Sequence, residues 1–111
     1  MNTFRSFLEV QNALQSSSVS CIDITTNYLQ RISVKKNINA FVEVYTEEAL
    51  EQAKIVDQKI HNGTAGKLAG MVVGIKDNLC YKNHKVSASS KILDGFESLF
   101  TATSVQRLLN E

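Results

Sequence analysis

Residues 70–78, GMVVGIKDN, decide how the rest of the chain is interpreted. The first six residues of this stretch are apolar or glycine, which is typical of a strand that enters a buried core. Lys76 follows directly, although moving an ammonium group out of water is costly. In one interpretation Lys76 marks the exit of the strand into solvent, and Asp77 and Asn78 open a turn. In the other, Lys76 is partly desolvated and exchanges protons near neutral pH.

A lysine of the second kind has a defined chemical use. It can act as a general base toward a hydroxyl nucleophile and later as a general acid toward a leaving amine. The candidate hydroxyl groups in the sequence are those of Ser87, Ser89 and Ser90. That stretch lacks the flanking glycines that give a backbone a sharp nucleophile turn and an oxyanion hole, so a structural serine cluster is the better interpretation. The chain therefore offers half of a catalytic pair.

Helical spacing of apolar residues predicts two leading helices, over residues 3–15 and 18–32. Ser20 and Asp23 form an acidic variant of a capping box at the start of the second helix. We expect the two helices to pack on each other as a helical hairpin within residues 1–36.

The remaining residues, 37–111, alternate strand and helix patterns. Residues 39–45, NAFVEVY, have the β-branched and aromatic composition of a strand, and residues 70–78 form the second predicted strand. A helix is predicted between them with Thr46 as its N-cap, and a last helix opens at a capping box that begins with Thr103. This alternation predicts α/β layering behind the two leading helices. The last helix has run only about two turns when the sequence ends, so we expect a longer protein.

Composition narrows the class of protein further. The chain has 111 residues, 43% of them hydrophobic, and a net charge of +1, so it lacks the basic excess that grips nucleic acid. Cys21 and Cys80 are far apart and neither has a CxxC partner, which argues against a zinc site or a disulfide framework and favours a reducing cytosol. The longest apolar run is too short for a bilayer. A soluble, cytoplasmic protein with no metal site and no membrane association is expected.

Residues 66–93, GKLAGMVVGIKDNLCYKNHKVSASSKIL, followed by FTATSVQRLL at residues 100–109, resemble the amidase signature enzymes. The resemblance implies that residues 1–111 are the N-terminal part of the amidase-signature fold, an α/β fold whose mixed sheet is covered by helices and is incomplete in this chain. Lys67 and Val72 stand where members of the family commonly have prolines.

The family uses a Ser–cis-Ser–Lys triad, and its lysine corresponds to Lys76. By the same resemblance, Asp77 and Asn78 orient that lysine. Both serines of the triad belong to a glycine- and serine-rich signature of the type GGSSGGS, which these 111 residues do not contain. The resemblance therefore implies a protein of several hundred residues, of which this part alone is expected to be inactive and to self-associate.

Within the family, the chain is most similar to the amidase-type component of the tRNA-dependent amidotransferases. Such a component hydrolyses the side-chain amide of glutamine or asparagine and passes ammonia to partner subunits, named B and C. There ATP and Mg²⁺ activate misacylated Glu-tRNA or Asp-tRNA, so this segment itself needs no cofactor and meets charged tRNA only through the complex. Two alternatives stay open: a stand-alone amidase of the same family, and a non-catalytic assembly module.

Overall fold

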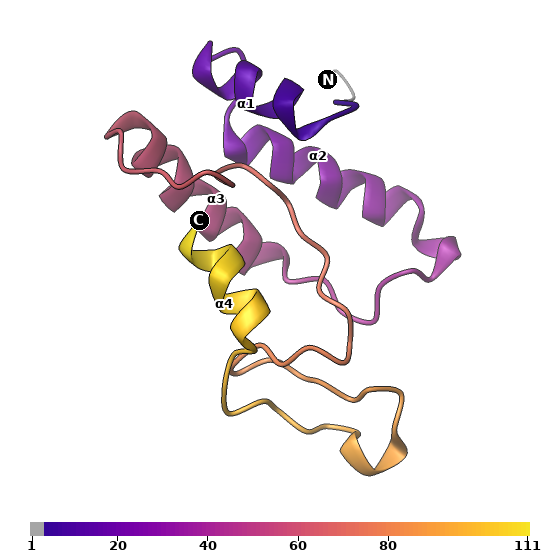
Figure 1. Cartoon of the computed structure of the whole chain (residues 1–111). Helices are drawn as coiled ribbons and strands as arrows, with labels where there is room; N and C mark the ends of the chain where they lie inside the picture. The colour runs from indigo at the N-terminus through magenta and orange to yellow at the C-terminus, as the bar shows by residue number, and fades with distance from the viewer. Residues whose placement is uncertain (1–3) are drawn as a thin grey trace. The chain divides into compact units, whose positions relative to one another are not determined.

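The computed structural model describes residues 4–111, and its regular elements are helices (Figure 1). In chain order they are α1 (Phe7–Gln15), α2 (Cys21–Val34), the 3-10 helix η1 (Lys36–Ile38), α3 (Thr46–His61), the 3-10 helix η2 (Lys91–Leu93) and α4 (Thr103–Asn110). The chain divides into two compact units, Met1–Val72 and Val73–Glu111. Among the described residues, no helix has the length and apolar character needed to cross a bilayer.

Side-chain caps fix where the first two helices begin. Ser6 precedes α1, and its hydroxyl accepts a hydrogen bond from the Glu9 N–H at 3.3 Å. Helix α1 thus begins later than predicted, and residue 3 lies outside the described residues. At α2, the Ser20 hydroxyl accepts from the Asp23 N–H at 3.1 Å, and the Asp23 carboxylate accepts from the Ser20 N–H at 2.9 Å. The predicted capping box is confirmed.

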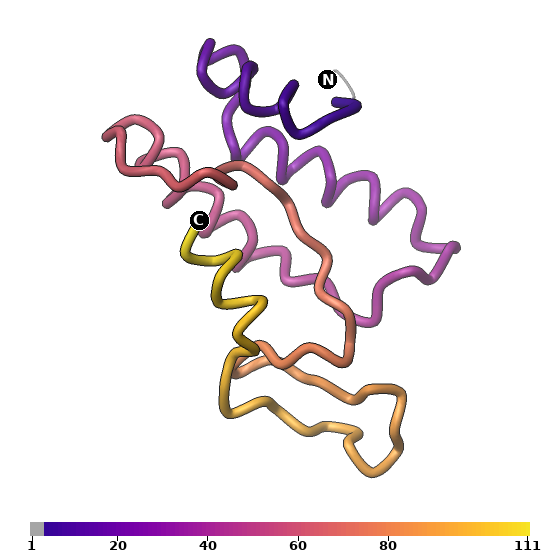
Figure 2. The backbone as a smooth tube through the Cα atoms, viewed as in Figure 1, coloured from indigo at the N-terminus to yellow at the C-terminus, as the bar shows by residue number. Residues whose placement is uncertain are grey.

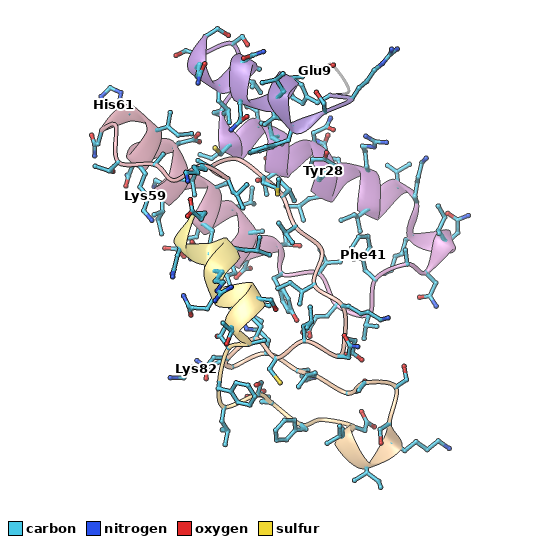
Figure 3. The ribbon with its side chains drawn as sticks, in the orientation of Figure 1. Glu9, Tyr28, Phe41, Lys59, His61 and Lys82 are labelled. Atoms are coloured by element: carbon cyan, nitrogen blue, oxygen red, sulfur yellow. The ribbon has the colours of Figure 1, made fainter. Side chains whose placement is uncertain are left out.

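Helix α3 has charges that suit both of its ends. Glu47 and Glu48 lie in its first turn, where the helix dipole favours anions, and Lys59 and His61 lie in its last turn (Figure 3). Thr46 is already the first helical residue, so the predicted N-cap is displaced by one position, and no side chain caps the helix.

Helix α4 begins without the predicted capping box. Ala102 is its N-cap and makes no side-chain cap, because Thr103 already lies inside the helix. The Gln106 amide instead donates to the Asn110 side-chain oxygen at 2.9 Å, one turn further along.

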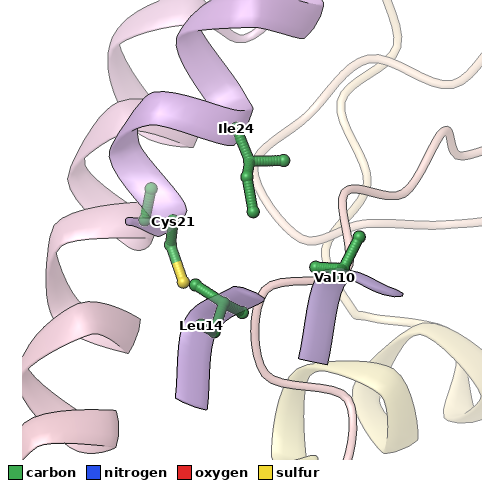
Figure 4. Packing of buried hydrophobic residues seen from close by; sticks show 5 residues of the cluster. Val10, Leu14, Cys21 and Ile24 are labelled. Carbon is green, nitrogen blue, oxygen red and sulfur yellow. The ribbon is translucent and has the colours of Figure 1, made fainter. Parts of the chain in front are cut away.

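The core of the first unit is built by α1, α2 and α3. Its buried side chains meet at the crossing of α1 with α2, where Leu14 and Cys21 lie together in Figure 4; they are Val10, Leu14, Cys21, Ile24 and Ala53. Partly buried side chains surround them: Phe4, Phe7, Val19, Val56 and Ile60. Helices of this length are marginal alone, so this shared apolar contact is what stabilises them.

The segment 62–72 leads back from the end of α3 to this core (Figure 2). The Met71 N–H closes a turn by donating to a carbonyl three residues earlier at 2.9 Å, and Gly70 within the turn has a φ of +86°. A Cβ at Gly70 would collide with Cδ1 of Leu14 and lie 3.5 Å from Sγ of Cys21. Both the backbone angle and the space therefore require glycine at this position.

Neither predicted strand is formed within residues 4–111. Residues 39–45 and 70–78 have irregular backbone, and the β-type pairing in this part of the chain is an isolated antiparallel bridge between Lys85 and Glu97. A strand exists only when a neighbouring segment pairs with its backbone, which the pattern of one segment cannot supply. The described part of the chain is therefore mainly helical, and the expected sheet is not seen in it.

In the second unit, residues 80–102 form a hairpin-like loop whose two arms lie side by side (Figure 1). Backbone hydrogen bonds in one register join Ala102 to Cys80 at 2.8 Å, Ser98 to His84 at 3.0 Å and Val86 to Phe96 at 3.1 Å. Hydrogen bonds, more than apolar packing, hold this unit in shape.

Candidate active site

Lys76, the predicted catalytic residue, begins a turn in the second unit. Its carbonyl accepts a hydrogen bond from the Leu79 N–H at 2.9 Å. Its side chain is exposed, and within residues 4–111 the ammonium group makes no hydrogen bond or ion pair. The expected partial desolvation is therefore absent from this part of the protein, because the described residues leave the side chain uncovered.

Asp77, in contrast, is tied to a second turn ten positions further along the chain. Its carboxylate accepts a hydrogen bond from the Ser87 N–H at 3.0 Å and a short one from the Ser87 hydroxyl. Its backbone carbonyl accepts from the Ala88 N–H at 2.8 Å. Side chain and backbone of Asp77 are thus both fixed to the same point.

That point is a tight turn over residues 87–90. The Ser90 N–H donates to the Ser87 carbonyl at 2.8 Å, and the two central residues, Ala88 and Ser89, have φ of +48° and +59°. Two successive positive φ angles are the mark of a type I′ turn, for which glycine and asparagine are preferred. The sequence argument that this stretch makes no sharp turn because it lacks glycine is therefore wrong. Hydrogen bonds to Asp77 hold the turn in place of glycine.

The same bonds set the charge state of the site. Hydrogen bonds from the Ser87 hydroxyl, and then from its N–H, lower the pKa of Asp77, with a smaller contribution from the Ser89 N–H; partial burial opposes them. Asp77 is consequently an anion at neutral pH and a poor proton acceptor. It does not activate Ser87 as a nucleophile.

The other predicted site residues are placed differently. Asn78 lies in the turn after Lys76 and is exposed, so within the described residues the fold brings Asp77, and not Asn78, to the serine turn. Ser87 was interpreted from the sequence as part of a structural cluster, and its pairing with Asp77 was missed. A serine and an aspartate ten residues apart carry no local pattern that distinguishes them from other polar residues.

A second polar contact lies in the first unit. The Asp57 carboxylate of α3 accepts from the backbone N–H groups of Cys21 and Ile22 at 2.7 and 3.2 Å, which caps the start of α2. Burial, together with a hydrogen bond to Asp57 and its negative charge, raises the pKa of Cys21 to about 12. The Cys21 thiol is therefore uncharged and unsuited to nucleophilic chemistry. In the described part of the chain, no group of three or more His, Cys, Asp or Glu side chains is placed to hold a metal ion.

Comparison with known families assigns the class of protein. The family model described as Amidase matches residues 23–111, a stretch that contains Lys76 and the turn bound to Asp77. This match covers most of the chain, and the chain belongs to the amidase family. No solved structure matches it significantly.

The curated relatives are the A subunits of glutamyl-tRNA(Gln) amidotransferases. The chain is 41% identical over 109 residues to the one from Chlorobaculum parvum, a match that covers 97% of this chain and 23% of the relative. It is 39% identical to the protein of the same name from Chlorobium chlorochromatii, over 93% of this chain and 22% of the relative. For that of Brachyspira hyodysenteriae the identity is 36%, again over 93% of this chain and 22% of the relative. The chain thus spans less than a quarter of the length of these relatives.

Proposed function

We propose that the chain is the N-terminal part of an amidotransferase component that hydrolyses the side-chain amide of glutamine or asparagine. The ammonia would serve to convert misacylated Glu-tRNA(Gln) or Asp-tRNA(Asn) into Gln-tRNA or Asn-tRNA. The observation that carries this proposal is the 41% identity, over 97% of the chain, to a protein named as part of such an amidotransferase. The uncommitted ammonium group of Lys76 beside a fixed carboxylate gives it a chemical basis.

Lys76 would be the acid and base of the reaction. Its unprotonated amine takes a proton, through the cis-serine, from the hydroxyl of the nucleophilic serine as that oxygen attacks the amide carbon. The resulting ammonium returns a proton to the departing nitrogen, so that ammonia leaves and an acyl ester remains. Water then attacks the ester and releases glutamate or aspartate. Both serines belong to the part of the protein beyond these residues.

The remainder of the protein would also complete the fold. Residues 39–45 and 70–78 would pair as strands of a mixed sheet that helices cover, with residues 1–36 as a helical hairpin and 37–111 as the start of the α/β core. Exposed apolar side chains in both segments support this: Val42 is 87% exposed and Val72 is 45% exposed. Residues 1–111 alone would accordingly self-associate and show no hydrolysis.

Partners and location follow from the same proposal. Subunits B and C would complete the enzyme. One of these partners would hold ATP and Mg²⁺, and charged tRNA would reach this segment only through the complex. We place the complex in the cytoplasm, because free Cys21 and free Cys80 fit a reducing compartment.

The test of this proposal is Lys76→Ala in the full-length protein. Because the proton acceptor is lost, acyl-enzyme formation and glutamine hydrolysis should fall by at least about a thousandfold. Lys54→Ala, which removes an exposed lysine from α3, serves as the matched control and should retain wild-type turnover. Turnover by Lys76→Ala within a few-fold of wild type contradicts the proposed role.

A second measurement separates the amidotransferase from a stand-alone amidase. Glutamine hydrolysis is followed with and without the partner subunits, ATP and charged tRNA. An increase on their addition supports the amidotransferase. Activity that is indifferent to all three supports a stand-alone amidase, and absence of any hydrolysis by the complete complex supports a non-catalytic module.

A further inference from the structure

The inference concerns how the direction of Lys76 is set, and it rests on the function proposed above. A general base must be held within about half an ångström of its productive position. Lys76 has a flexible four-carbon side chain that residues 4–111 leave exposed and unbonded. What these residues do fix is the backbone immediately after it.

The fixed point is the carboxylate and the carbonyl of Asp77. Three hydrogen bonds reach this one residue from the turn at residues 87–90: two come from Ser87 and one comes from the Ala88 N–H at 2.8 Å. Two of these bonds end on the side chain and one ends on the backbone, so rotation of the peptide unit next to Lys76 would break bonds of both kinds. The exit direction of the lysine is therefore coupled to the turn.

The turn itself is under strain. Ala88 and Ser89 both have positive φ, a conformation that costs a non-glycine residue about 1–2 kcal/mol. Such a conformation persists only where neighbouring contacts over-determine it. Ser87 supplies those contacts, since its hydroxyl and N–H both donate to the Asp77 carboxylate.

We propose that Ser87 is a positioning residue for Lys76, acting through Asp77. Its hydroxyl is the one side-chain donor within the described residues that joins the strained turn to the exit of the lysine. Ser87 does not react with substrate, because its proton is held by a carboxylate that is a weak base. Losing the hydroxyl frees the turn and lets the Lys76 backbone move.

The experiment uses the full-length protein in its complex, with Ser87→Ala, Ser87→Thr and Ser87→Cys, and measures kcat and KM for glutamine. Removal of the hydroxyl should lower kcat by about tenfold to a hundredfold, as expected for a displaced catalytic group, and leave KM within about twofold. Threonine keeps the donor and should restore kcat to within about threefold. Cysteine has the same shape and a weaker donor, and should give an intermediate kcat.

Two further variants decide what a negative result means. Ser104→Ala removes an exposed serine from the first turn of α4 and is the matched control, which should keep wild-type kcat. Lys76→Ala is measured in parallel: if it stays active, the proposed function fails whatever Ser87 does. If Lys76→Ala is inactive while Ser87→Ala keeps kcat within twofold, the positioning role is overturned and the proposed function stands.

Folding is monitored for every variant by its thermal midpoint. If Ser87→Ala does not fold, the decision passes to Ser87→Cys, in which the turn keeps its volume. A loss of kcat in Ser87→Cys with an unchanged midpoint supports positioning. An equal loss of kcat in Ser87→Thr, which retains the hydroxyl, assigns the effect to packing and overturns the inference.

Discussion

The two units of the chain are stabilised in different ways. In the unit Met1–Val72, three helices share one apolar cluster, and side chains as far apart in sequence as Val10 and Ala53 belong to it. In the unit Val73–Glu111, only Val86, Val105 and Ser98 are buried, and turns joined by hydrogen bonds define the backbone. Changes in the first unit should therefore act on global stability, whereas changes in the second should act on the local geometry around Lys76.

Truncating the apolar cluster should have the largest effect on stability. Leu14 is 8% exposed, and Leu14→Ala should lower the free energy of unfolding by about 3 kcal/mol through lost burial and a residual cavity. Leu8, on the same helix, is 65% exposed, and Leu8→Ala should cost less than about 1 kcal/mol. Urea unfolding of both variants checks the pair, and equal losses would show that the cluster does not hold the first unit together.

Removing a long-range helix cap should have an intermediate effect. Asp57→Ala leaves the Cys21 and Ile22 N–H groups without their carboxylate partner, which should cost about 1–2 kcal/mol in urea unfolding. Glu51→Ala, an exposed acidic residue on the same helix, is the control and should stay within about 0.5 kcal/mol of wild type. A difference too small to measure between these variants would mean that α2 is capped sufficiently by its own Ser20.

The smallest effect should be confined to the second unit and should depend on pH. Because the folded protein lowers the pKa of Asp77, the stabilisation from its hydrogen bonds is fully present above about pH 4 and is lost as the pH falls through the lowered value. Hydrogen exchange of the amides at residues 87–90 should therefore accelerate in acid beyond the intrinsic rate. Asp77→Asn should remove this dependence.

The first unit supplies the comparison for that measurement. Asp23 also has a lowered pKa, because the Ser20 hydroxyl and N–H donate to it, so the start of α2 should show its own acid dependence. Asp77→Asn should leave the protection at α2 as it is in the wild type. A change at α2 in this variant would show that the two units do not respond separately.

The site was predictable from the sequence only in part. The pattern of residues 70–78 identified Lys76 as chemically distinctive, and the family match extends over that residue. The bond between Asp77 and Ser87 was not predictable, because the two residues are brought together by a turn whose positive φ angles fall on Ala88 and Ser89. Nothing in the identity of alanine or serine announces that conformation.

The sequence by itself determined what depends on neighbours three or four residues apart. The capping box of Ser20 with Asp23 and the end of α3 at His61 both follow from local chemistry, and both are present. The tertiary structure alone decided the contacts between distant residues: the cap that Asp57 places on α2, and the need for glycine at position 70 against Leu14. It also decided that residues 39–45 and 70–78 have no strand partner within residues 4–111. Helical hydrogen bonds are made within one segment, whereas strand pairing and packing need a second segment whose position no local pattern encodes.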